Sequence, residues 1–183
     1  WPMGPFAMGD LAGLDIGKTN AKALGKKAVI ADAICERGRY GQKTGRGYYI
    51  YEKGSRTPTP DPEIEKLIED KAREAGVNRR VISAEEIAER TMYPMVNEGA
   101  RILEEKIAAR PSDIDIVWIN GYGFPIGRGG PMFWADLTGL RKIADRLEYW
   151  HGRTGKDVFK PSALLKRLAG EGKTFSSLQE SKV

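Results

Sequence analysis

The chain has 183 residues, of which 40% are hydrophobic and 30% charged, a balance typical of a globular protein. The net charge is +5, but basic and acidic residues alternate along the chain, which indicates solvated helix faces and argues against nucleic-acid binding. No apolar stretch is long enough to span a membrane. One cysteine excludes an internal disulfide, so nothing demands an oxidising compartment and we expect a cytoplasmic protein.

The first part of the chain predicts short helices around a glycine-rich loop. Pro5 suits a first helical turn, and apolar residues at near-helical spacing predict a helix over 6–24. A second helix is expected over 28–38, ending at Gly38. Residues 38–54, GRYGQKTGRGYYIYEKG, predict an irregular loop or short β-hairpin whose tyrosines pack onto the helices.

A proline-rich segment gives the best internal boundary. Pro58, Pro60 and Pro62 cannot continue a helix, so we divide the chain into a first domain over 1–57 and a second over 58–183. A helix should then begin near Asp61 and end at Gly76.

The rest of the second domain predicts further helices. Ser83 with Glu86, and Ser112 with Asp115, have the spacing of capping boxes that open helices. The first of these helices contains Pro94, which should kink it. Its residues available for a buried face are Ile87, Met95, Ala100, Ile102, Leu103 and Ile107. Later helices are expected over 131–152 and 161–172, followed by a polar tail over 173–183 that frays.

An internal repeat changes the interpretation of the whole chain. Residues 1–14 recur at 124–140 with seven of fourteen positions identical once 128–130 is treated as an insertion. Such a repeat implies two stacked copies of one helical unit, so we predict a mainly all-α fold built from a tandem duplication. Asp10 and Asp136 occupy matched positions, and each should brace the turn formed by its Pro-x-Gly neighbours.

Several motifs suggest chemistry but fail on spacing. Gly121, Gly123 and Gly127 do not have the dinucleotide-binding spacing, and Pro125 interrupts the turn. The two Gly-Lys-Thr tripeptides, at 17–19 and 172–174, lack the preceding glycine of a phosphate-binding loop and are interpreted as helix-end or loop glycines.

The lone histidine and cysteine are also interpreted as structural residues. His151 is placed at a helix end with no nucleophile or carboxylate pattern around it, and Cys35 is expected to be a buried small residue. We expect no metal site and no catalytic residue in this chain.

Three segments carry a family resemblance: residues 1–17, WPMGPFAMGDLAGLDIG; the loop ERGRYGQKTGRGYYIYEKG; and residues 89–140, which open with ERTMYPMVNEGARILEEKIAARPSDIDI. Together they resemble the duplicated helical C-terminal region of 3-hydroxyacyl-CoA dehydrogenases, as in multifunctional fatty-acid oxidation enzymes. The resemblance implies NAD-dependent oxidation of a 3-hydroxyacyl-CoA to a 3-ketoacyl-CoA. It also implies that NAD and a His–Glu pair belong to a Rossmann domain upstream of Trp1, that a hydratase region precedes it, and that a thiolase is a possible partner.

The resemblance gives this chain a supporting role and predicts that it is inactive alone. Pro2, Gly4, Pro5 and Phe6 are the candidates for lining the substrate cleft. The family's substrate-assisting asparagine, placed before an arginine, matches Glu89 before Arg90 in the second copy, so that copy should buttress the first in a pseudo-dimer.

Two alternatives stay open. One is a non-catalytic helical interaction module, and the other is an RNA-binding repeat, which would need a continuous basic face. The ending Ser181-Lys182-Val183 resembles a peroxisomal signal but ends in valine, so peroxisomal location is the alternative to cytoplasmic.

Overall fold

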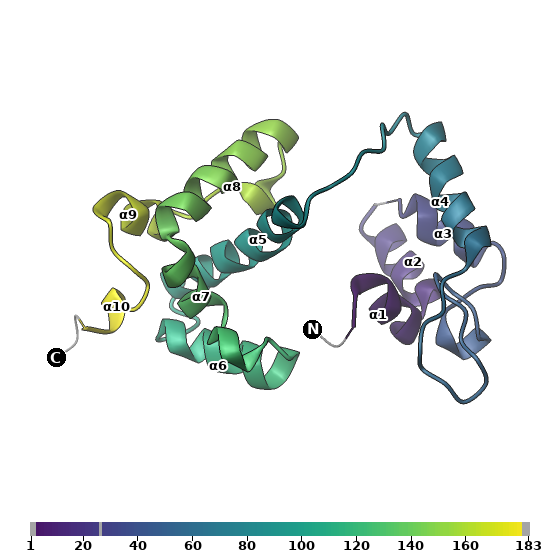
Figure 1. Cartoon of the computed structure of the whole chain (residues 1–183), viewed down its shortest axis with the longest axis horizontal. Helices are drawn as coiled ribbons and strands as arrows, with labels where there is room; N and C mark the ends of the chain where they lie inside the picture. The colour runs from purple at the N-terminus through teal and green to yellow at the C-terminus, as the bar shows by residue number, and fades with distance from the viewer. Residues whose placement is uncertain (1–2, 26, 181–183) are drawn as a thin grey trace. The chain divides into compact units, whose positions relative to one another are not determined.

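The computed structural model describes residues 3–25 and 27–180, and these form helices joined by loops (Figure 1). In these residues the β-type pairing is limited to isolated antiparallel bridges, Gly41 to Arg46, Arg46 to Ile50 and Ile50 to Thr59. The all-α prediction is therefore confirmed, and residues 38–54 form an irregular loop. No helix in the described ranges is long and apolar enough to cross a membrane.

The first compact unit falls within residues 2–80. Its helices are α1 (Pro5–Ala12), α2 (Leu14–Ala23), α3 (Val29–Cys35), the 3-10 helix η1 (Gln42–Thr44) and α4 (Pro62–Glu74). They enclose a small core whose buried members are Leu14, Ile34, Cys35, Ile64 and Leu67.

Helix α4 belongs to this first unit, although the sequence boundary assigned it to the second domain. Ile64 and Leu67 lie on one helical face and are buried in the core with residues of α3. The compact units accordingly divide between Arg80 and Val81, not between residues 57 and 58. The prolines do stop the backbone from forming a helix, but they precede a helix that folds back onto α3.

The second compact unit covers the described residues from Val81 onward. Its helices are α5 (Ala84–Glu104), α6 (Pro111–Tyr122), η2 (Ile126–Arg128), α7 (Pro131–Thr138), α8 (Leu140–Thr154), η3 (Asp157–Phe159), α9 (Ala163–Glu171) and α10 (Ser177–Glu180). Figure 1 shows α5 running through the middle of this unit, where it contacts α6, α7, α8 and α9.

The buried face of α5 differs from the predicted one. Ser83 caps the helix as expected, since its hydroxyl accepts from the Glu86 amide at 3.1 Å. However, Ile87 is 53% exposed and Ile107 is 72% exposed. Ala100 is buried as predicted, and Ile102 and Leu103 are partly buried against the core. The core is also reached by Tyr93 and Val96, which the apolar spacing did not single out because Glu89 and Asn97 share the buried face.

Two further predictions in this unit are corrected. Helix α6 is capped by Arg110, whose amide donates to the Asp113 carboxylate at 3.0 Å, and not by Ser112 with Asp115. The tail is also more ordered than predicted, because Phe175 is fully buried in the core of the unit.

Each of the two predicted repeat helices is divided in two by a glycine. Gly13 (φ 100°, ψ 118°) separates α1 from α2, and Gly139 (φ 95°, ψ 115°) separates α7 from α8. A positive φ of this size is accessible to glycine but strained for residues with a Cβ. Because the torsions agree within a few degrees, both copies bend in the same way at the same point of the repeat.

Candidate functional site

The predicted cleft residues gather at the start of α1. Gly4 is the extended N-cap, Pro5 occupies the first turn, and the Gly4 carbonyl accepts from the Met8 amide at 3.0 Å. The Phe6 ring is 50% exposed and packs against the Tyr48 ring, with 4.6 Å between centroids. Pro2 lies outside the described residues. Tyr48 was not among the predicted site residues, although the tyrosines of its loop were expected to pack onto the helices.

A buried carboxylate holds the glycine-aromatic loop beside α1. Asp10 is fully buried, and its oxygens accept from the amides of Tyr48 (2.9 Å) and Tyr49 (3.0 Å) and from the hydroxyl of Tyr51 (3.0 Å). Burial and the hydrogen bond to Asp10 raise the pKa of Tyr51 to about 12. This close approach of the loop requires glycine at position 47, because a Cβ there would lie 2.0 Å from the Asp10 Oδ1.

The second copy repeats the arrangement. Asp136, the match of Asp10, accepts from the amides of Phe175 at 2.7 Å and Ser176 at 3.0 Å. The two aspartates therefore do not brace their Pro-x-Gly neighbours as predicted. Each carboxylate instead accepts from backbone amides of a loop that lies about forty residues later in the chain, Tyr48 and Tyr49 for Asp10 and Phe175 and Ser176 for Asp136.

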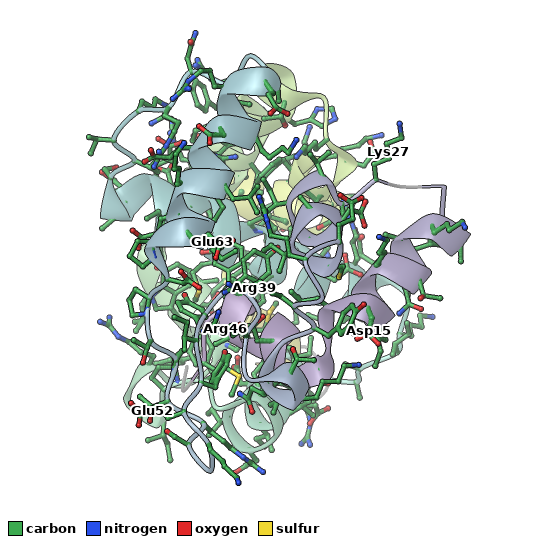
Figure 2. All side chains as sticks on the ribbon, turned by 90° about the vertical axis from the view of Figure 1, so that its right-hand side faces the viewer. Asp15, Lys27, Arg39, Arg46, Glu52 and Glu63 are labelled. Atoms are coloured by element: carbon green, nitrogen blue, oxygen red, sulfur yellow. The ribbon has the colours of Figure 1, made fainter. Side chains whose placement is uncertain are left out.

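Arg39 anchors the other side of the loop in the first unit. Its Nε donates to the Gly47 carbonyl at 3.1 Å, and its Nη2 lies 2.5 Å from the Asp61 carboxylate, which in turn caps α4 by accepting from the Glu63 amide. Figure 2 shows Arg39 beside Glu63, whose carboxylate is 3.5 Å from its Nη1. Burial acts to raise the pKa of Asp61, but the hydrogen bonds from Arg39 and the Glu63 amide, together with the charges of Arg39 and Arg46, outweigh it and hold that pKa below its ordinary value.

Glu89, at the position that the resemblance matched to a substrate-assisting asparagine, is fully used by the fold. Its carboxylate receives a two-pronged contact from Arg146, at 2.8 and 2.7 Å, and accepts from the Trp150 Nε1 at 3.0 Å. Burial acts to raise the pKa of Glu89, but these hydrogen bonds and the charges of Arg146 and Lys142 together outweigh it, and the pKa is lowered. With only 4% of the residue exposed, this carboxylate is not presented to a ligand.

Asp115 of α6 holds the first turn of α7. Its oxygens accept from the amides of Met132 at 2.7 Å and Phe133 at 3.2 Å. Burial raises the pKa of Asp115. Gly130 permits the approach, since a Cβ there would lie 2.3 Å from the Asp115 Cβ. The acid that sequence spacing assigned to its own helix therefore caps the next one.

The described residues hold none of the catalytic or cofactor arrangements considered from sequence. Gly121 is inside α6 and Gly123 is its left-handed C-cap, so this segment is not a strand that enters a phosphate-binding loop. Gly172 caps α9 as predicted, whereas Gly17 lies inside α2 and not at a helix end.

The predicted buried position of Cys35 is confirmed. Cys35 is buried, and burial raises the pKa of its thiol, which disfavours the reactive thiolate. Within the ranges that the structure describes, no cluster of His, Cys, Asp and Glu is arranged to hold a metal, and no buried side-chain nitrogen or oxygen lacks a hydrogen-bond partner.

The glycine-aromatic loop also borders an open pocket of about 440 Å³. Its lining carries charges of both signs and is formed by Gln42, Gly45, Tyr51, Glu52, Lys53, Gly54, Ser55 and Arg56.

Comparison with known families assigns the chain to a class. Residues 1–51 and 87–179 match the family described as 3-hydroxyacyl-CoA dehydrogenase, C-terminal domain, and the chain belongs to this family. Each matched stretch contains one copy of the internal repeat, and the unmatched segment between them includes α4.

The individual relatives are multifunctional enzymes. The peroxisomal bifunctional enzymes of Danio rerio and Homo sapiens are 44% and 40% identical, and each alignment covers 93% of this chain and 26% of the relative. The peroxisomal fatty acid beta-oxidation multifunctional protein of Arabidopsis thaliana is 39% identical over 99% of this chain and 26% of its own length. The chain therefore spans about a quarter of the length of these relatives.

Solved structures agree on the fold. The dehydrogenase part of multifunctional enzyme 1 from C. elegans has a TM-score of 0.70 at 33% identity, covering 91% of this chain and 38% of that one. The 3-hydroxybutyryl-CoA dehydrogenase from Escherichia coli has a TM-score of 0.62 at 17% identity, covering 93% and 52%, and shows a shared fold.

Proposed function

We propose that this chain is the helical C-terminal part of an NAD-dependent 3-hydroxyacyl-CoA dehydrogenase of fatty-acid β-oxidation, which converts a 3-hydroxyacyl-CoA to its 3-ketoacyl-CoA. The observation that carries the proposal is the family match, which covers both copies of the repeat. The names of the relatives, which include fatty acid beta-oxidation multifunctional proteins, support the same pathway.

The proposed role of the first unit is to form one wall of the substrate cleft. Its candidate lining residues are Pro2, Gly4, Pro5 and Phe6. The Tyr48 ring packs against the Phe6 ring. Half of the Phe6 ring is exposed, which gives an acyl chain an apolar surface to contact. Asp10 acts only through the loop that it holds, so it is a positioning residue and not a catalytic one.

Neither NAD nor the proton-transferring pair is assigned to the residues of this chain. Dinucleotide binding needs a glycine-rich turn between a strand and a helix, and the described residues contain no named strand. We propose that NAD, the His–Glu pair and a hydratase region belong to upstream domains of the longer polypeptide. The relatives' length is consistent with this, since the chain covers 26% of the Danio rerio enzyme.

The second unit is proposed to support the first in a pseudo-dimer. The Glu89 carboxylate accepts hydrogen bonds from Arg146 and Trp150, so it is not available to bind a substrate. This favours a structural role for the second unit. An association with a thiolase subunit is part of the proposal and rests on the resemblance alone.

For location, we propose the peroxisome in place of the cytoplasm. The support is that the relatives from fish, human and plants are named as peroxisomal or glyoxysomal enzymes.

The test compares acetoacetyl-CoA-dependent NADH oxidation by the full-length protein and by the 183-residue chain. We expect activity in the full-length protein and none in the chain. In the full-length protein, Phe6→Ala should raise KM more than it lowers kcat, while Ile107→Ala, which changes a side chain that is 72% exposed, should change neither. Activity in the chain alone would refute the assignment of chemistry upstream, and silence in both would favour a non-catalytic interaction module.

A further inference from the structure

The open pocket beside the glycine-aromatic loop has two basic side chains in its lining, Lys53 and Arg56. Both residues are exposed. Among the residues that the structure describes, neither side chain forms an ion pair or a hydrogen bond with another protein group. We call this cavity, lined by Gln42, Gly45, Tyr51 and residues 52–56, the loop pocket.

The other basic side chains of the same loop have partners within the fold. Arg39 donates to the Asp61 carboxylate, and the Lys43 ammonium lies 2.6 Å from the Asp15 carboxylate. The charge of Arg46 helps to hold the pKa of Asp61 below its ordinary value. The two cations of the loop pocket therefore differ from their neighbours, because no contact in the described part of the chain accounts for them.

Hydrogen bonds of the loop itself fix one wall of the pocket. Ile50 and Thr59 exchange backbone hydrogen bonds of 2.9 and 3.0 Å, which close the segment between them. Inside this segment, the Ser55 amide donates to the Glu52 carbonyl at 2.9 Å, and the Thr57 amide donates to the Ser55 hydroxyl at 3.1 Å. A wall that is already ordered lowers the entropy cost of binding a ligand.

The inner side of the pocket is held as firmly. Tyr51 is 6% exposed, its hydroxyl donates to Asp10 at 3.0 Å, and its amide donates to the Gly45 carbonyl at 2.9 Å. The loop pocket is therefore built on the same buried carboxylate that holds the glycine-aromatic loop beside α1.

Backbone amides add hydrogen-bond donors to the two cations. The amides of Lys53, Gly54 and Arg56 have no acceptor among the described residues. Gly54 has a φ of 83°, which allows the chain to turn between the two basic residues. Neighbouring amides in a turn, next to basic side chains, are donors suited to the oxygens of a phosphate group.

We infer that the loop pocket binds a phosphate-bearing small molecule, whose phosphate oxygens accept from Lys53, Arg56 and the amides of the turn. An arginine can donate two parallel N–H groups to a phosphate, and a lysine binds it as a point charge. The volume of about 440 Å³ lies within the range of small-molecule sites, about 300–1,000 Å³, and leaves room for an organic group beside the phosphate.

The charge of the lining favours a small ligand over a polyanion. Glu52 offsets one of the two cations, so the lining carries one net positive charge. Nucleic acids and anionic membranes are held by several cations at once. The family match ends at residue 51, so membership of the family does not by itself assign this site.

The test is a titration of the 183-residue chain with pyrophosphate at physiological salt, followed by the NMR shifts of backbone amides, and it does not use dehydrogenase activity. We expect saturable shifts at Lys53, Gly54 and Ser55. The double variant Lys53→Gln, Arg56→Gln should weaken binding at least about tenfold, which corresponds to about 1.4 kcal/mol. Glu52→Gln should strengthen binding, because it removes a negative charge from the lining.

A matched control removes the same two charges from the second unit. The double variant Arg141→Gln, Lys156→Gln changes two exposed cations and should leave the affinity for pyrophosphate unchanged. Titrations with inorganic phosphate and with adenosine 3′,5′-bisphosphate then identify the source of the phosphate. Tighter binding of the bisphosphate would support a nucleotide, and tighter binding of inorganic phosphate would overturn the part of the inference that concerns an organic group.

Three results would overturn the inference as a whole. One is a set of shifts that stays linear with pyrophosphate concentration, and another is an equal loss of affinity in the two double variants. The third is weaker binding by Glu52→Gln, since a carboxylate that helps to bind the probe would mean that the pocket does not select an anion.

Discussion

Replacing Asp10 with asparagine should loosen the glycine-aromatic loop while the rest of the chain stays folded. Asparagine keeps the shape of the side chain but turns one acceptor oxygen into a donor NH₂ group. The three donors of Tyr48, Tyr49 and Tyr51 then cannot all be satisfied, and one amide faces another donor.

The size of the effect follows from the burial of this contact. A hydrogen bond to a charged group contributes about 1.5–3 kcal/mol, and a buried donor without an acceptor costs about 1–3 kcal/mol. For one lost bond at a fully buried carboxylate, we expect a loss of about 2–3 kcal/mol in the free energy of opening the loop. At tenfold per 1.4 kcal/mol, this corresponds to about 30- to 150-fold faster exchange of the loop amides.

Hydrogen exchange of the 183-residue chain measures this locally, in peptides that cover residues 41–51. Asp136→Asn is the matched control, since it makes the same change in the second copy, where Ser176 is an exposed donor. It should accelerate exchange around Phe175 and leave residues 41–51 unchanged. If Asp10→Asn changes the exchange of residues 47–51 by less than about threefold, the carboxylate does not hold the loop.

Three further predictions follow from other contacts. Gly47→Ala should lower the thermal stability of the first unit, because the new Cβ would lie 2.0 Å from the Asp10 Oδ1. The control is Gly17→Ala in helix α2, where a new Cβ meets no atom within 4 Å and the free energy of unfolding should rise by about 0.5–1 kcal/mol. Melting curves with equal midpoints for the two variants would contradict this. Because the pKa of Glu89 in the fold is held below its ordinary 4.5, its ionised form stabilises the second unit above that pH, and this contribution is lost as pH falls through the lower folded-state value. Glu89→Gln should therefore flatten the acid dependence of urea unfolding followed by tryptophan fluorescence between about pH 5 and 3, and an unchanged pH slope would count against it. Finally, the exposed apolar side chains of Phe6, Met8 and Leu24 should make the isolated chain self-associate, and Met8→Asp should reduce the association; a strictly monomeric species at high concentration by light scattering would contradict this.

Periodicity and capping signals located most helices correctly because they depend on local sequence. The helix starts at Pro5, Asp61, Ser83 and Ser162 all follow from a proline or a capping side chain next to the helix. The breaks at Gly13 and Gly139 were missed because an isolated glycine in a helical pattern is usually tolerated. Only the packing of the following helix shows that the backbone there turns to a positive φ.

The contacts that shape the site could not be predicted from spacing, because they join residues far apart in the chain. Asp10 and Asp115 both looked like local turn or capping residues, yet each binds amides from another element. The sequence placed Phe6 in the site through the family resemblance, but no sequence signal short of the repeat itself pairs it with Tyr48. The same limit explains α4, whose burial on α3 depends on where the chain folds back after the prolines.

The matched bends at Gly13 and Gly139 make this repeat a natural place for recombining its two halves. A helix that leaves either glycine departs in nearly the same direction from the one before it, since both torsion angles agree within a few degrees. A chimaera that joins α1 to α8 at this glycine would therefore keep the backbone geometry between the two helices, and only the side-chain packing around the joint would change. The two copies have diverged in charge, burial and partners around the joint, while the backbone at the joint has stayed interchangeable.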